Sequence, residues 1–189
     1  MIYPISIIGS SILRKKTVEI SKDYPGLQQL ISDMFETMYA ADGIGLAAPQ
    51  IGKAIRLLVI DANPLAEDDP TLAGFKKVFI NAKITETEGE SELMNEGCLS
   101  IPGIQEEVKR INKIRLEYYD ENFDFHDEYY QGFAARVLQH EYDHLDGILF
   151  VDRVSPIRKT LIRSKLKDIS KGKFEAKYQY RLGVEKKRT

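Results

Sequence analysis

The chain has little of several residue types: among 189 residues there are one cysteine, three histidines and no tryptophan. A single cysteine, Cys98, excludes an intrachain disulfide. No apolar run is long enough to span a bilayer, so we expect no membrane partner. The opening MIYPISIIGSSILRKK has no basic segment before its apolar residues and no small-residue cleavage site after them. It therefore predicts mature, cytoplasmic protein rather than a signal peptide.

Charge is unevenly distributed, although the formal net charge is only −2. Residues 153–189 hold 13 Lys and Arg against 3 acidic residues, whereas residues 1–152 hold 14 against 26. A basic end on an acidic body indicates an anionic partner such as nucleic acid. A solvated basic face without a partner explains the same pattern equally well.

The length suits one domain, and the apolar spacing predicts its elements. We expect helices at residues 25–41, 133–145 and from Pro156 to just before Gly172, and strands at residues 55–61, 77–88, 103–119 and 123–131. Residues 43–52 and 62–76 are predicted loops. Helices separate from consecutive strands indicate an α+β fold, with mostly antiparallel sheets around the helix at 133–145.

That central helix contains LQHEYDHLDG (residues 138–147), with two of the three histidines four residues apart. His140 and His144 would share one helix face and could reach one metal ion. Glu141, next to His140, could reach a water at that ion without being a ligand. A solvated helix that carries these residues by chance is the alternative.

A third ligand is not found downstream of the helix. The extended zinc-protease pattern H-E-x-x-H-x-x-G-x-x-H matches through Gly147 but has Phe150 at its last position. The following predicted helix offers no glutamate, and Glu175 lies beyond its end. Upstream, Cys98 in NEGCLSIPG is the best remaining soft ligand, and a thiolate with two imidazoles leaves one open position.

GIGLAAPQ (residues 43–50), EGCLS (residues 96–100) and HEYDH (residues 140–144) are similar to the three signature motifs of the peptide deformylase family. The resemblance covers about residues 1–155, so we expect these to form the catalytic part and residues 156–189 a helix and basic tail of the same domain. It implies an α+β fold and one divalent metal, Fe²⁺ in the cell, with Zn²⁺, Ni²⁺ or Co²⁺ able to occupy the site. It also implies removal of the N-formyl group from the formyl-methionine of new polypeptides, by attack of metal-bound hydroxide.

Residue roles follow from the resemblance. Gln50 resembles the side-chain donor to the oxyanion and the Leu99 N–H its main-chain partner. Phe133 and Val137 share the helix face of His140 and, with Ile44, could line a pocket for the methionine side chain, although ordinary core packing explains Phe133 and Val137 equally well.

Gly43, Gly45 and Gly97 would leave main chain free to pair with an extended peptide by strand addition. Glu96 and Arg110 could pair as a brace or touch substrate.

Two other functions compete with deformylation. The HEYDH helix could serve a zinc endopeptidase, which lacks its downstream ligand here, or a structural metal site in a nucleic-acid-binding protein, which lacks a fourth ligand.

The basic C-terminal region could also anchor the enzyme to ribosomes without contributing to the chemistry; no DNA partner is expected. The helix from Pro156 would place Arg158, Lys159, Arg163, Lys165 and Lys167 around an apolar stripe that can dock on the body, formed by Ile157, Leu161, Ile162, Leu166 and Ile169. Alternatively, this helix only completes the fold.

Overall fold

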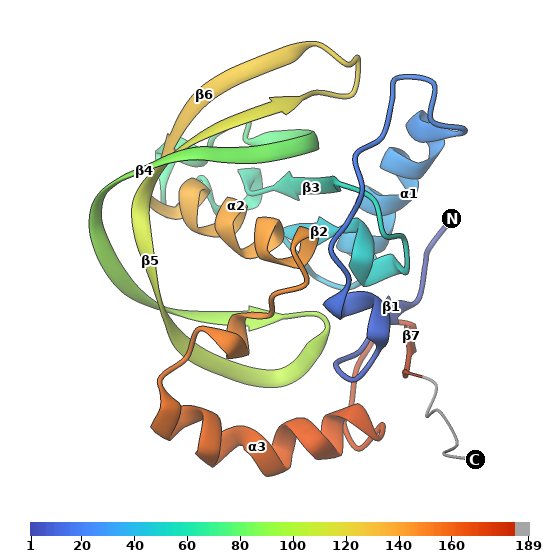
Figure 1. Ribbon diagram of the computed structural model, residues 1–189, viewed down its shortest axis with the longest axis vertical. Helices are drawn as coiled ribbons and strands as arrows, with labels where there is room; N and C mark the ends of the chain where they lie inside the picture. The colour runs from blue at the N-terminus through green and yellow to red at the C-terminus, as the bar shows by residue number, and fades with distance from the viewer. Residues whose placement is uncertain (184–189) are drawn as a thin grey trace.

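In the computed structural model, which describes residues 1–183, a bent sheet wraps around one central helix (Figure 1). That helix is α2 (Gly132–Leu145). The antiparallel sheet has the order β2-β3-β4-β5-β6, formed by β2 (Gly45–Ala47), β3 (Leu57–Asp61), β4 (Lys76–Cys98), β5 (Ile101–Tyr119) and β6 (Phe125–Gln131). Two short strands near the chain ends, β1 (Ile5–Ser6) and β7 (Tyr180–Arg181), pair in parallel.

The three predicted helices are present with ends within two residues of the expected ones: α1 (Leu27–Ala40), α2 and α3 (Pro156–Ser170). Ser155 caps α3 by accepting from the Arg158 N–H, and Gly147 follows α2 at a φ of 74°, a value that favours glycine. The predicted α+β class, with mostly antiparallel strands around α2, is therefore confirmed. None of the helices in residues 1–183 has the length and apolar character needed to cross a membrane.

β4 is much longer than the predicted strand at residues 77–88, because it continues to Cys98 as a hairpin with β5. The alternation of apolar and polar residues that predicts a strand is missing from residues 85–95, because these residues are exposed on both faces of the hairpin. Register shifts between Ile80 and Lys83 and between Glu88 and Ser91 bend the hairpin around α2 (Figure 1). The bend brings Cys98 back to α2.

The two predicted loops contain short elements of regular secondary structure. Residues 43–52 contain β2 and a 3₁₀ turn, η2 (Ala48–Ile51), while residues 62–76 contain η3 (Asn63–Leu65) and η4 (Pro70–Leu72). β2 exists because β3 pairs with it, a tertiary contact that overrides the glycine-rich composition.

α3 does not dock along its whole apolar stripe. Ile162 and Ile169 are buried and Leu166 packs beside them, but Ile157 and Leu161 are 75% and 65% exposed. The stripe therefore docks through Ile162, Leu166 and Ile169, while the first turn of α3 is held to β5 by the ion pair between Arg158 and Glu106.

Candidate metal centre

α2 carries three polar side chains into the interior. His140 and His144 lie one turn apart with their ring centroids separated by 5.3 Å. Glu141 and His144 are only 4% and 1% exposed. Buried polar groups need partners, so this helix is stable only with specific neighbours around these residues.

The sulfur of Cys98 meets the two imidazoles. One ligand atom from each of Cys98, His140 and His144 lies within 4.8 Å of the others, and Cys98 Sγ is 3.3 Å from His144 Nε2. Cys98 ends β4, so the hairpin and α2 together assemble the cluster. A thiolate and two imidazoles are soft donors that suit a divalent transition metal, so these residues fit one.

A buried charge network orients His140. The Nδ1 atom of His140 lies 2.9 Å from Glu96 Oε2, and Arg110 binds the same carboxylate through two hydrogen bonds of 2.6 and 2.8 Å. Arg136 donates to Glu96 as well, at 2.8 Å. Burial alone would raise the pKa of Glu96, but the hydrogen bonds from Arg110 and His140 outweigh it and lower the pKa to about 2. A carboxylate at Nδ1 keeps the proton there and leaves Nε2 free as a ligand.

Glu141 lies against the main chain of β2. A Cβ at Gly45 would be 2.5 Å from Glu141 Oε1, so only glycine leaves room for the carboxylate. Within residues 1–183, Glu141 Oε2 is buried without a hydrogen-bond partner. Burial raises the pKa of Glu141 to about 7, a value suited to a group that takes and returns protons near neutral pH. The orphaned oxygen leaves a hydrogen-bonding position for a water beside the cluster.

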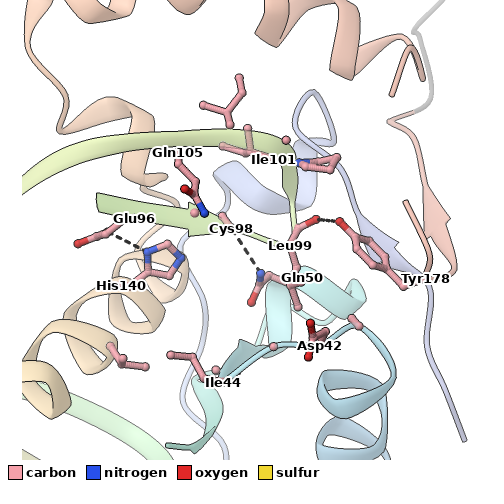
Figure 2. Close-up of a pocket in the computed structure, with 18 of the residues that line it drawn as sticks. Asp42, Ile44, Gln50, Glu96, Cys98, Leu99, Ile101, Gln105, His140 and Tyr178 are labelled. Atoms are coloured by element: carbon pink, nitrogen blue, oxygen red, sulfur yellow. Dashed lines mark hydrogen bonds and ion pairs between the residues drawn. The ribbon is translucent and has the colours of Figure 1, made fainter. Parts of the chain in front are cut away.

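The Gln50 side chain has a defined orientation. Its Oε1 accepts from the Ala47 N–H at 2.8 Å, which only an oxygen can do, so the amide nitrogen must face the other way. That nitrogen lies 3.6 Å from Cys98 Sγ (Figure 2). It also lies 3.3 Å from Ser100 Oγ. A buried N–H donor is thereby aimed at the cluster.

A cavity of about 1070 Å³ opens beside Cys98, His140 and Glu141. The predicted pocket residues all line it: Ile44, Gly45, Gly97, Phe133 and Val137. Gln50 and Leu99 line it too, while His144 is buried behind Cys98. Phe133 and Val137 also pack in a core cluster, so cavity lining and core packing are compatible for them.

Residues 175–178 line the same cavity, which differs from the expectation that the C-terminal region lies apart from the chemistry. The Tyr178 hydroxyl donates to the Leu99 carbonyl oxygen at 2.6 Å (Figure 2), and burial raises the pKa of Tyr178 to about 12. Tyr178 and Arg136 were missed by sequence reasoning. Arg136 sits four residues before His140 on α2, a detectable spacing, whereas Tyr178 is 79 residues from Leu99 and has no local signal.

Comparison with known proteins agrees with this geometry. A family profile described as polypeptide deformylase matches residues 2–160. A peptide deformylase of Christiangramia forsetii is 50% identical over 99% of each chain, and one of Flavobacterium psychrophilum is 49% identical over the full length of both. A crystal structure of a peptide deformylase from Legionella pneumophila superposes with a TM-score of 0.78 at 37% identity, covering 90% of this chain and 96% of the other.

These matches support metal-dependent deformylation and give no support to the endopeptidase alternative. Peptide deformylases act in general on the formyl-methionine of nascent peptides. The chain belongs to the peptide deformylase family.

Proposed function

We propose that Cys98, His140 and His144 hold the catalytic metal and that the adjoining cavity receives the N-terminus of a formylated peptide. This proposal rests on one observation: the three ligand atoms lie within 4.8 Å of one another, next to an open cavity. A divalent ion held there would polarise the formyl carbonyl and lower the pKa of water. We infer Fe²⁺ in the cell, and the same thiolate and imidazole donors accept Zn²⁺, Ni²⁺ or Co²⁺.

Glu141 acts as the proton carrier. Its raised pKa, about 7, lets the ionised carboxylate take a proton from the attacking water and then release it. The proton goes to the departing amine nitrogen, so that the C–N bond breaks to give formate and a free amino terminus. The neighbouring main chain of Gly45 holds the carboxylate in place, because any side chain there would displace it.

Gln50 and Leu99 stabilise the negative charge that develops on the formyl oxygen. The Gln50 amide nitrogen is directed to the cluster by the bond between its oxygen and Ala47. The Leu99 N–H lies in the turn after Cys98, and within residues 1–183 no hydrogen bond is recorded for it. Two donors facing one small carbonyl favour formyl over larger acyl groups.

The remaining cavity residues bind the peptide. Ile44, Phe133 and Val137 offer an apolar surface for the methionine side chain. β2 is the first strand of the described five-stranded sheet, so the main chain at Gly45 lies at a sheet edge. An extended peptide would pair there, and Gly97 lines the same cavity.

The experiment measures formate release from a formyl-Met peptide together with metal content. Wild-type protein should release formate, Cys98→Ala should lose both metal and activity, and Glu141→Ala should retain metal with turnover lowered by orders of magnitude. Full metal occupancy in Cys98→Ala would contradict the ligand assignment. A comparable rate on acetyl-Met peptide would contradict the formyl selectivity.

Nascent chains emerge from ribosomes, so the proposed location of the enzyme is the cytoplasm. The proposed contact with the ribosome is α3. Some of its cations are used within the fold, because Arg158 pairs with Glu106 and Lys165 binds the Gly103 carbonyl. Within residues 1–183, three exposed cations make no ion pair: Arg163 and Lys167 on α3, and Lys171 directly after it. Exposed Ile157 and Leu161 lie on the same helix.

Changing Arg163, Lys167 and Lys171 to Gln together should leave formate release unchanged and weaken co-sedimentation with ribosomes at low salt. Exposed Lys15, Lys16 and Lys22, changed in the same way, provide a control with equal loss of charge. Equal co-sedimentation of both variants would exclude α3 as the contact.

A further inference from the structure

The two ends of the described chain meet at the turn that follows Cys98. β1 and β7 pair through hydrogen bonds from the Ile5 N–H to Gln179 O, at 2.9 Å, and from the Ile7 N–H to Arg181 O, at 3.0 Å. The paired strands form a small sheet of their own, apart from the main sheet (Figure 1). Residues 175–178, which precede β7, line the cavity.

A residue near each strand donates one hydrogen bond to this turn. The Ile8 N–H, just after β1, donates to the Ser100 carbonyl at 2.9 Å. The Tyr178 hydroxyl, just before β7, donates to the Leu99 carbonyl at 2.6 Å. Two adjacent residues of the turn are thus held by the segments that flank the two strands of one small sheet, and the conformation of the turn depends on both.

The same C-terminal segment also covers the turn that bears Gln50. Gly52 ends that turn, and a Cβ added to Gly52 would lie 1.6 Å from Arg181 Nη2. Arg181 is held in this position by a 3.0 Å hydrogen bond from its Nε to Ser6 Oγ. One segment of the chain therefore contacts the supports of both proposed oxyanion donors.

We propose that residues 174–181 form a positioning segment for the deformylase site, and that Tyr178 is the positioning residue which holds the Leu99–Ser100 turn. The proposal rests on the proposed role of the Leu99 N–H. Fixing the Leu99 carbonyl restricts the backbone rotation of Leu99, and the Ile8 bond restricts the next residue. A donor held in this way needs little reorganisation when charge develops on the formyl oxygen.

A purely structural role for Tyr178 makes a different prediction. Its ring packs beside the core, so loss of packing would lower thermal stability and leave turnover per folded molecule unchanged. Tyr178→Phe keeps the ring and removes only the hydroxyl. Tyr180→Phe is the matched control, because Tyr180 lies two residues away, packs on Phe174 with ring centroids 4.6 Å apart, and has no side-chain hydrogen bond recorded within residues 1–183.

The experiment compares full-length wild type, Tyr178→Phe and Tyr180→Phe at equal metal content. In Tyr178→Phe, kcat for a formyl-Met peptide should fall about three- to tenfold, the effect of one hydrogen bond, while KM changes less than about twofold. Amide hydrogen exchange in the peptide spanning residues 96–102 should become faster. Tyr180→Phe should match wild type in both measurements.

Two results would overturn the proposal: unchanged exchange at residues 96–102 in Tyr178→Phe, or an equal loss of kcat in both variants. The exchange measurement needs no turnover. A wild type that releases no formate would therefore refute the proposed function, while the effect of Tyr178 on the turn would still be tested.

Discussion

Replacing Gly45 with alanine tests how closely Glu141 is held, because the new methyl group would overlap its carboxylate. The added Cβ would lie 2.5 Å from Oε1, 2.8 Å from Cγ and 2.9 Å from Cδ of Glu141, whereas ordinary contacts begin at 3.4 Å. The carboxylate must therefore move by about 1 Å, and a displacement of that size at a reacting group costs about 10²-fold in rate. The metal donors are untouched, so metal content should not change.

The assay is kcat for formate release, measured with metal content and thermal stability on the same sample. Gly97→Ala is the comparison, since its Cβ would come no closer than 3.5 Å to Gln105, an ordinary contact. Its kcat should fall far less than that of Gly45→Ala. Wild-type kcat in Gly45→Ala, or activity lost only in proportion to metal, would refute the inference that Gly45 positions Glu141.

Three further predictions concern Gln50 and Glu96. Gln50→Ala should lower kcat by about 10²–10³-fold with metal retained, because it removes one oxyanion donor. A much smaller loss of kcat would show that Gln50 is not that donor. Glu96→Gln should lower the free energy of unfolding in urea by about 3–5 kcal/mol, because Arg136 loses its buried counter-charge and Arg110 keeps only its pair with Asp143. A change near zero would contradict this. The pKa of Glu96 is about 2 in the folded chain, compared with 4.5 for an unperturbed glutamate. Its stabilising contribution is therefore present above pH 4.5 and is lost as the pH falls toward 2. Urea midpoints should therefore drop on acidification in wild type and drop less in Glu96→Gln.

Prediction from sequence worked best where the signal is local. The spacing of His140 and His144 and the caps Ser155 and Gly147 depend on residues within a few positions of each other, so α2 and α3 were predicted closely. The long hairpin was predicted poorly, because its outer residues are exposed on both faces. Residue composition gave no sign that β4 would run on to Cys98.

The pairing of Glu96 with Arg110 was left open by the sequence and is decided by the structure. Sheet pairing brings the two strands together, and Arg136 from α2 and the Nδ1 atom of His140 complete the network. Buried charges need several partners at once, and those partners come from β4, β5 and α2, with Arg136 lying 40 residues from Glu96 in the chain. No single motif contains that information.

The sequence alone determined the donor types, the helical spacing of the metal ligands and the identity of the family, because these depend on residue chemistry and short-range geometry. Only the tertiary structure decided the environment of each group. Burial raises the pKa of Glu141 to about 7, the bond to Ala47 orients Gln50, and Tyr178 reaches Leu99 from the other end of the chain. These effects arise from atoms brought within a few ångströms by folding, and neither their distances nor the exclusion of water is written in any short stretch of residues.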